Sequence, residues 1–299
     1  MNETPYIVSG TDTMLGKEME EYPGGIVIPV DKPYRWTSAD VIRKIKFSAC
    51  RHFGKKNLKV GHAGTLDPLA TGILIVCIGN ATKIAEELQS HNKEYIAGIS
   101  FGATTPSYDL EKDVDRMFPY EHITEESICR ALMQFIGEQE QIAPLFSAKS
   151  VDGVRAYELA RKLYKKNIQS PETPDVSLDN AAESLLRTSI INITEAELLS
   201  FTPGKDSVTA GNQESVAKTA EEVPKASGRI NVADTSYLGL PHADIRLACS
   251  KGTYVRAFAR DLGEALGSGA HLDSLRRTRS GYFTIDDSVS LERALSLLQ

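Results

Sequence analysis

The 299-residue chain lacks the usual marks of membrane, secreted and metal-binding proteins. Its longest apolar stretch, Ile73 to Ile78, is far shorter than the roughly 20 residues that span a bilayer. The first 23 residues contain acidic residues and no apolar core, so they do not resemble a secretory signal. The cysteines are isolated and form no metal-type pair: Cys50, Cys77, Cys129 and Cys249. We therefore expect a cytoplasmic protein.

An excess of basic charge is also missing, because the net charge is −6. This value argues mildly against a nucleic-acid-binding protein, but the distribution of charge weakens the objection. Lys and Arg gather in residues 32–59 and 246–279. Two basic segments in an acidic chain suit a local phosphate-binding face. The alternative is solvated helix surface, since lysine-rich surface helices are common.

The chain shows no internal repeat and no regular alternation of strands with helices. Apolar and β-branched runs predict strands at residues 24–29, 73–79, 94–101, 187–201 and 242–250. Amphipathic segments with capping residues predict helices that follow Ser38 as N-cap and cover residues 124–136, 156–165 and 255–266. This interspersed order favours an α+β fold with a mixed, largely antiparallel sheet over a doubly wound one.

Two segments are expected to lie outside the folded part of the chain. Residues 1–23 are polar and acidic, and we expect an N-terminal tail. Residues 203–236 contain no aromatic residue and few large apolar ones. Such a segment buries too little surface to offset its ordering entropy, so a low-complexity insertion is expected. Residues 24–299 otherwise form one expected domain.

The segment GHAGTLDPLATG, residues 61–72, places Asp67 on a glycine-flanked connection. Asp followed by Pro commonly starts a helix, because Asp is a good N-cap and Pro a good first helical residue. Here Thr71 and Gly72 and then a strand follow almost at once, which leaves room for barely one turn. A carboxylate on a short connection between strands is well placed to face a ligand.

The extended segment GHAGTLDPLATGIL resembles the catalytic motif of TruB-type tRNA pseudouridine synthases, usually GHTGTLDPLATG. The preceding DKPYRWTSADVIRKIK resembles that family's DKP-x-G-x-[ST]-S segment. Three more blocks follow in the family's order: KEYIAGISFGATTPSYD (93–109), QIAPLFSAKSVDGVRAYELAR (141–161) and CSKGTYVRAFARDLGEALGSGAHLDSLRRTRSGYF (249–283). The resemblance covers residues 24–290, so it implies a pseudouridine synthase catalytic domain.

The resemblance implies that a uridine in the tRNA T loop, position fifty-five in tRNA numbering, is converted to pseudouridine. The reaction needs a carboxylate nucleophile, a base and an apolar pocket that retains free uracil. The target must be flipped out of its stack. No redox change or external donor is involved, so no cofactor or metal is expected. The tRNA T arm is the expected partner, and a monomer without membrane contact is the default expectation.

The family's functional residues map onto matching positions. Asp67 matches the nucleophile, Tyr95 the tyrosine that stacks on the base and accepts its proton, and Arg256 the partner of the catalytic carboxylate. Those that match substrate-binding positions are His62, Gly64, Lys251, Tyr254 and Leu275. From sequence alone, Tyr95 could equally be an ordinary strand tyrosine. Arg256 could lie on a helix surface, Leu275 could be core, and His62 could be a structural hydrogen-bonding group.

The chain departs from the family pattern at several places. Ala63 replaces a threonine, Ala143 a proline and Ser150 a lysine. The 203–236 insertion is longer than usual, and we expect this chain to lack the C-terminal PUA domain of larger members.

Three other functions are compatible with parts of the sequence. The chain could act on another RNA, as guide-dependent relatives do, but those carry the C-terminal domain. It could be an inactive RNA-binding or chaperone module, against which Asp67, Tyr95 and Arg256 argue together. A glycosidase would need a second carboxylic acid as general acid, and none lies near Asp67 in sequence.

Overall fold

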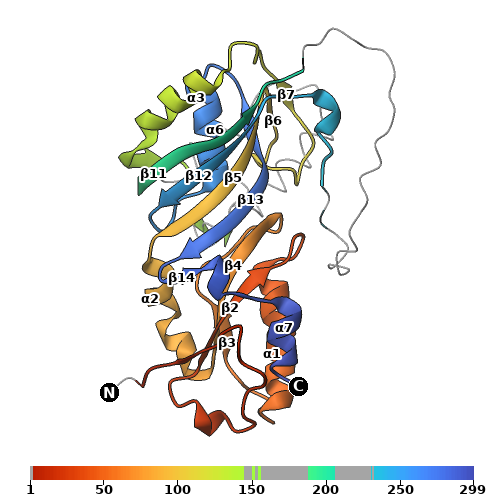
Figure 1. The fold of residues 1–299 in the computed structure, drawn as a ribbon, viewed down its shortest axis with the longest axis vertical. Coiled ribbons are helices and arrows are strands. Elements are labelled where there is room, and N and C mark those ends of the chain that lie inside the picture. The colour runs from red at the N-terminus through yellow and green to blue at the C-terminus, as the bar shows by residue number, and fades with distance from the viewer. Residues whose placement is uncertain (1–2, 145–149, 152–153, 156–187, 206–229, 231) are drawn as a thin grey trace. The chain divides into compact units, whose positions relative to one another are not determined.

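The computed structural model describes residues 3–144, 150–151, 154–155, 188–205, 230 and 232–299 (Figure 1). The chain divides into two compact units. Unit 1 comprises Met1–Ile96, Val208–Ile230 and Leu275–Gln299, and unit 2 comprises Ala97–Ser207 and Asn231–Ser274. The expected helix at 156–165 and most of the expected insertion lie outside the described residues. In the part described, no helix is long and apolar enough to cross a membrane.

Unit 1 is a sheet with short helices. Its elements are β1 (Tyr6–Ile7), η1 (Met19–Glu21), β2 (Ile26–Lys32), α1 (Ser38–His52), β3 (Val60–His62), β4 (Ala70–Ile78), η2 (Gly79–Ile84), α2 (Ala85–Ser90), β14 (Phe283–Thr284), η5 (Ile285–Asp287), β15 (Val289–Ser290) and α7 (Leu291–Ser296). Strands β5 (Lys93–Phe101) and β13 (Ala270–Ser280) begin or end in it. The strand order is β1-β2-β4-β13-β5, with β3 also pairing β4.

The centre of unit 1 is the antiparallel pair β2–β4, in register from Ile26 opposite Ile78 to Lys32 opposite Gly72. Every residue from Ile73 to Ile78 is fully buried. A strand buried on both faces needs apolar residues at consecutive positions, which explains the continuous run in the sequence.

The N-terminus of α1 differs by one residue from the expectation. Thr37 is the N-cap, because its side chain accepts a hydrogen bond from the backbone N–H of Asp40 at 3.0 Å. The Asp40 carboxylate in turn accepts from the N–H of Thr37, which completes a capping box. Ser38, predicted as the cap, is instead buried and has another role, described below.

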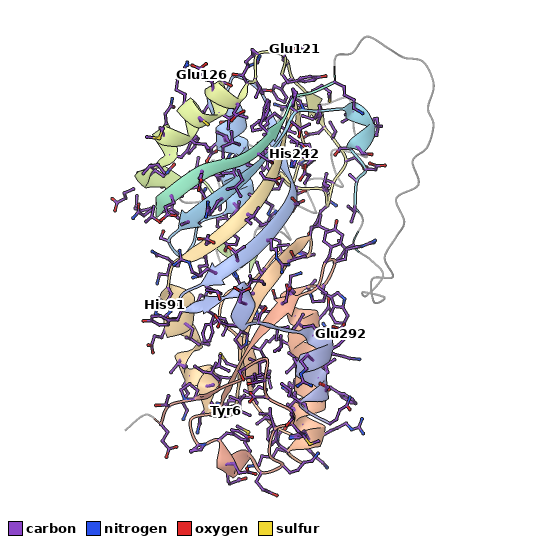
Figure 2. The ribbon with its side chains drawn as sticks, in the orientation of Figure 1. Tyr6, His91, Glu121, Glu126, His242 and Glu292 are labelled. Carbon is purple, nitrogen blue, oxygen red and sulfur yellow. The ribbon has the colours of Figure 1, made fainter. Side chains whose placement is uncertain are left out.

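Part of the expected N-terminal tail is ordered structure. β1 pairs in parallel with β2, and Val8 and Leu15 are buried. The ring of Tyr6, which is labelled in Figure 2, meets the Tyr22 ring edge-on at 5.3 Å between centroids. The polar composition concealed this, because a two-residue strand and two apolar side chains give no periodic signal.

Unit 2 contains β6 (Ala103–Thr104), β7 (Arg116–Met117), α3 (Glu125–Leu132), η3 (Met133–Phe135), β8 (Gly137–Gln141), β9 (Ser150–Val151), β10 (Val154–Arg155), β11 (Ser189–Thr202), η4 (Ser236–Leu238), β12 (His242–Cys249) and α6 (Val255–Ala265). Its main sheet has the order β13-β5-β12-β11-β8. The pairs β8–β11 and β11–β12 are antiparallel, which confirms the α+β class.

One face of β12 is buried and the other is polar. Ala243, Ile245 and Leu247 are buried, whereas His242 and Asp244 alternate with them and are half-buried. This period of two is the expected signature of a strand with one covered face.

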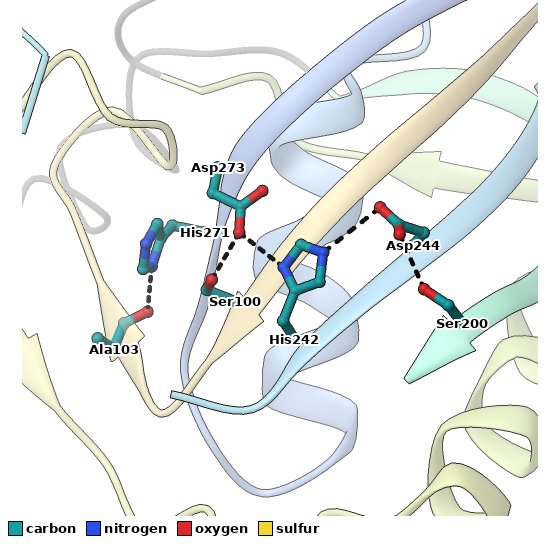
Figure 3. Close-up of polar contacts among 7 residues, drawn as sticks. All are labelled: Ser100, Ala103, Ser200, His242, Asp244, His271 and Asp273. Carbon is teal, nitrogen blue, oxygen red and sulfur yellow. Dashed lines mark hydrogen bonds and ion pairs between the residues drawn. The ribbon is translucent and has the colours of Figure 1, made fainter. Parts of the chain in front are cut away.

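A network of polar side chains crosses the four neighbouring strands β13, β5, β12 and β11 (Figure 3). Asp273 of β13 accepts hydrogen bonds from Ser100 of β5 at 2.8 Å and from Nδ1 of His242 at 2.7 Å. On β11 and β12, Ser200 donates to Asp244 at 2.8 Å, and Asp244 lies 3.4 Å from Nε2 of His242.

The hydrogen bond to Asp273 raises the pKa of His242 above its ordinary 6.5. Burial raises the pKa of Asp273, but the hydrogen bonds from His242, Ser100 and Ser274 and the charge of His242 together outweigh burial, so the pKa lies below its ordinary 3.8.

These shifts predict how the free energy of unfolding depends on pH. The His242 contribution is complete below pH 6.5 and is lost as the pH rises through the higher folded pKa. The Asp273 contribution is present above its ordinary 3.8 and is lost as the pH falls through the lower folded pKa. We expect the melting temperature of His242→Gln to fall less than that of the wild type between pH 6 and 8.5. Calorimetry of both proteins in matched buffers checks this, and parallel curves would contradict it.

Candidate active site

Asp67 lies on a tight turn between β3 and β4 in unit 1. The backbone N–H of Ala70 donates to the carbonyl of Asp67 at 3.1 Å, which closes a four-residue turn. Pro68 occupies the second turn position, where its fixed φ is favourable. No helix follows, because β4 begins at Ala70. The Asp-Pro pair therefore starts a turn, and the half-buried Asp67 is held at the entry of β4, which is buried throughout except at Thr71.

The first support of this turn comes from α1. The Ser38 hydroxyl donates to the carbonyl of Leu66 at 3.0 Å and accepts from the N–H of Leu66 at 2.9 Å. Both groups of the residue preceding Asp67 are thereby satisfied inside the protein. Because Ser38 is the first residue of α1, this helix begins directly at the Asp67 turn.

The second support is Lys32, whose side chain is 0% exposed. Its ammonium donates to the carbonyls of Trp36 at 2.6 Å, Pro33 at 3.0 Å and Pro68 at 3.2 Å. Burial lowers the pKa of Lys32 to about 7, although the neighbouring Asp67 charge opposes this shift. Three carbonyl acceptors satisfy all three ammonium donors, which makes a buried lysine tolerable.

The third support is Arg277 of β13, which is 1% exposed. Its guanidinium donates to the carbonyls of Ile73 at 2.7 Å and Gly64 at 3.1 Å, and one nitrogen lies 3.5 Å from the Thr65 carbonyl. Close approach of β13 requires Gly72, which has φ +95° and whose added Cβ would lie 2.2 Å from the Arg277 carbonyl oxygen. Arg277 thus ties β4 to the loop before Asp67.

Four other predicted residues also belong to unit 1. Leu275 lies opposite Ala70 in the parallel β13–β4 pair, so the strand register brings it beside the end of the Asp67 turn. Gly64 has φ +100°, which favours glycine, and its carbonyl is an Arg277 acceptor. Tyr95 on β5 is 8% exposed.

His62 on β3 is half-buried, and burial, assisted by the positive charge of Arg277, lowers its pKa. Its Nδ1 is buried without a hydrogen-bond partner among the described residues. The hydrogen bonding of this nitrogen therefore gives no support to the alternative that His62 is only a structural hydrogen-bonding residue.

The remaining three predicted residues belong to unit 2. Arg256 in the first turn of α6 is 5% exposed, so the alternative of a surface arginine is wrong. Its Nε lies 3.6 Å from the Asp109 carboxylate, and a guanidinium nitrogen donates to the Ser107 carbonyl at 3.2 Å. Its pairing with Asp67 stays a prediction.

Tyr254 caps α6, and its peptide is fixed by Gln141. The amide of Gln141 accepts from the Tyr254 N–H at 2.8 Å and donates to the Tyr254 carbonyl at 3.2 Å. Lys251 is exposed on the turn that precedes the helix. An exposed lysine and a half-buried tyrosine thus lie next to the start of one helix.

Sequence reasoning missed the supports of the Asp67 turn. Lys32 and Arg277 fall in the two basic segments expected to face phosphates, yet both are fully buried. In the sequence, only the apolar residues near Lys32 and Arg277 could have indicated that these two cations are buried. Arg35 was also overlooked: it occupies the glycine position of DKP-x-G and has φ +62°, an uncommon conformation for arginine. Its guanidinium donates to the carbonyl of Ile230 at 2.8 Å.

Among the described residues, no group of three or more His, Cys, Asp or Glu side chains is arranged to hold a metal ion. The expectation that catalysis needs no cofactor stays a prediction.

Solved structures share this fold. A Cbf5-Nop10-Gar1 complex matches with a TM-score of 0.53 and 25% identity over 95% of this chain and 59% of that chain. An H/ACA RNP bound to a substrate RNA containing 2′-deoxyuridine matches with a TM-score of 0.51 and 23% identity over 95% and 58%. The chain spans less than two thirds of either. The fold is that of the pseudouridine synthases, which defines the class of protein.

Sequence comparison defines the family. Residues 51–179 match the TruB family pseudouridylate synthase N-terminal domain, and residues 256–298 match the tRNA pseudouridylate synthase B C-terminal domain. The tRNA pseudouridine synthase B of Phocaeicola vulgatus is 47% identical over 90% of this chain and 91% of its own length. That of Bacteroides fragilis is 44% identical over 91% and 90%. The chain belongs to the TruB family, and it is a tRNA-modifying isomerase.

Proposed function

We propose that the enzyme isomerises the uridine at position fifty-five, in the T loop of tRNA, and that Asp67 is the nucleophile. The observation that carries this proposal is the support of the Asp67 turn by Ser38, Lys32 and Arg277. Buried, charged side chains are costly to maintain. Two such side chains, Lys32 and Arg277, fix one short turn, and this cost is understandable if the Asp67 carboxylate on that turn must be held in a defined position.

The chemistry asked of the site is limited. The flipped uridine loses its N1–C1′ bond while the Asp67 carboxylate attacks the ribose or the base. The uracil turns, a C5–C1′ bond forms, the bond to Asp67 breaks so that the carboxylate is released, and the C5 proton is removed while N1 gains a proton. Substrate and product are isomers, so the reaction needs no external donor. Lys32 lies close enough to Asp67 for the carboxylate charge to oppose the effect of burial on the lysine.

The substrate contacts follow from the remaining residues. Leu275 beside the turn supplies apolar surface to the base. The Nδ1 of His62, which has no partner in the part of the chain that the structure describes, is available to a rearranged loop. Lys251 supplies a charge for a phosphate. The enzyme acts as a monomer, and a cytoplasmic location follows from the tRNA substrate.

The test uses an unmodified tRNA transcript and no guide RNA. Pseudouridine keeps the RNA mass unchanged but reacts with carbodiimide, and primer extension then stops at the modified position. We expect one stop, in the T loop. A stop at another position would overturn the assignment of the uridine, and a requirement for a guide would favour the guide-dependent alternative. Absence of any stop with folded enzyme would favour the RNA-binding module.

Tyr95→Phe tests the predicted proton acceptor. Phenylalanine keeps the stacking surface and loses the hydroxyl, so we expect kcat to fall at least about 100-fold. The Kd for tRNA should stay within about three-fold. Single-turnover rates and filter binding measure the two quantities, with Tyr282→Phe, an 82% exposed tyrosine, as the control. Wild-type rates for Tyr95→Phe would exclude a role in proton transfer.

A further inference from the structure

Helix α1 presents a basic face away from the core of unit 1. Val41, Ile45 and Ala49 are buried and follow one another at intervals of four residues. Arg43, Phe47 and Arg51 have the same spacing, so they form a second line along the helix. All three are exposed, with Phe47 63% exposed. We call Arg43, Lys44, Phe47 and Arg51 the α1 basic face.

The charge of this face is hardly compensated. Helix α1 has four Lys or Arg residues and one Asp, in a chain whose net charge is −6. Arg43 forms an ion pair with Asp40 at 2.8 Å. Among the residues that the structure describes, neither Lys44 nor Arg51 has a carboxylate within 4 Å. A positive face on an acidic protein fits a polyanion.

The exposed aromatic ring adds a second feature. The guanidinium carbon of Arg51 lies 5.7 Å from the centroid of the Phe47 ring. Arginine beside an aromatic ring is a combination suited to nucleic acid, because the guanidinium binds phosphate and the ring packs on ribose or base. If this face were only solvated helix surface, an exposed phenylalanine such as Phe47 would have no role in it.

The position of the helix identifies which part of an RNA could reach this face. Ser38 at the start of α1 is hydrogen-bonded to Leu66, next to Asp67. The 15 residues of α1 extend about 22 Å from that point, at 1.5 Å per residue. The face is therefore within reach of the stem of an RNA whose loop delivers its uridine to Asp67.

We propose that the α1 basic face binds the phosphate backbone of the stem that carries the target loop. The inference rests on the proposed function, since it takes a loop uridine at Asp67 as its starting point. The contacts are phosphate contacts from Lys44 and Arg51 and an uncharged contact from Phe47. They contribute to tRNA affinity and not to the reaction of the bound uridine.

The experiment measures the Kd for unmodified tRNA by filter binding at several KCl concentrations. The double variant Lys44→Gln/Arg51→Gln removes two charges and is compared with Arg116→Gln/Arg130→Gln, which removes two exposed charges from unit 2. We expect the α1 variant to raise Kd about ten-fold at 0.1 M KCl. The slope of log Kd against log salt should fall by about two, because each phosphate contact contributes close to one. The control should change neither.

Phe47→Ala separates the aromatic contact from charge. It should raise Kd several-fold and leave the salt slope unchanged, because no counterion is released on its account. At saturating tRNA, kcat of all these variants should stay within two-fold of the wild type. An unchanged salt slope in the α1 double variant, or an equal change in the control, would overturn the proposal.

A hairpin that contains only the T stem and loop tests the choice of stem. The α1 double variant should weaken hairpin binding by the same factor as whole-tRNA binding. A defect confined to the whole tRNA would mean that another arm contacts α1, and would overturn the proposal. Carbodiimide mapping on the same samples identifies the modified uridine independently of the measured Kd values. A wrong target position would refute that assignment while the salt slope still reports the contact with α1.

Discussion

Replacing Asp67 with asparagine is expected to reduce pseudouridine formation below detection, a fall of more than about 10⁴-fold. Asparagine has nearly the same shape and can keep neutral hydrogen bonds, but its amide cannot act as the nucleophile. The turn should persist, because its closing bond joins the backbone of Asp67 and Ala70. The Kd for tRNA should therefore stay within a few-fold of the wild type.

The measurement is carbodiimide-detected modification under single-turnover conditions, with filter binding on the same protein. Asp31→Asn is the matched control, since Asp31 is also a carboxylate beside β4 and accepts from the Gly72 N–H at 3.1 Å. We expect this control to keep most of the activity. Turnover by Asp67→Asn after removal of any deamidated protein would exclude Asp67 as nucleophile.

Arg277→Lys is expected to lower both stability and kcat. Lysine cannot reproduce a planar group that binds carbonyls of Ile73 and Gly64 together, so at least one buried carbonyl loses its donor. Such a loss costs about 1–3 kcal/mol of unfolding free energy, or a melting temperature lower by roughly 3–10 °C. Because a displacement of about 1 Å in a catalytic group can cost 100-fold, we expect kcat to fall about 10- to 100-fold.

The neighbouring Arg276 provides the control. Its guanidinium pairs with Asp31 at 2.8 Å, but the arginine side chain is 41% exposed and the aspartate side chain 33%. An ion pair this open contributes at most about 1 kcal/mol, so Arg276→Lys should change the melting temperature and kcat little. A positioning role for Arg277 requires kcat to fall at temperatures well below unfolding while KM for tRNA stays within about three-fold. A lower melting temperature with normal kcat would leave Arg277 a purely structural role.

The two cations beside the Asp67 turn change the interpretation of the basic segments. Sequence reasoning grouped Lys32 with the surface lysines of residues 32–59, but Lys32 and Arg277 are buried and bind main-chain carbonyls. Charge counting along a sequence cannot separate a buried cation from a solvated one, because both appear as single basic residues. Lys44 and Arg51 of α1, by contrast, are exposed, and they are the cations that we propose to contact RNA.

Local rules predicted the regular elements with small errors. β4, β5, β12, α3 and α6 lie within a few residues of their predicted ranges, because each has a clear apolar period and a capping or glycine residue at an end. Thr37 in place of Ser38 as N-cap is a one-residue error between two residues of similar capping preference. The pairing of β1 with β2 was not predictable, because it joins segments about 20 residues apart through backbone bonds that leave no pattern in the side chains.

The sequence by itself determined the α+β class, the family and the position of Asp67 between two strands, since these depend on short-range periodicity and on a continuous motif. Only the tertiary structure decided what holds the Asp67 turn. Ser38, Lys32 and Arg277 reach it from positions 28, 36 and 213 residues from their acceptors. It also decided which basic residues are buried, and that Leu275 lies opposite Ala70. Contacts between distant segments depend on strand register and packing, and no single stretch of sequence contains that information.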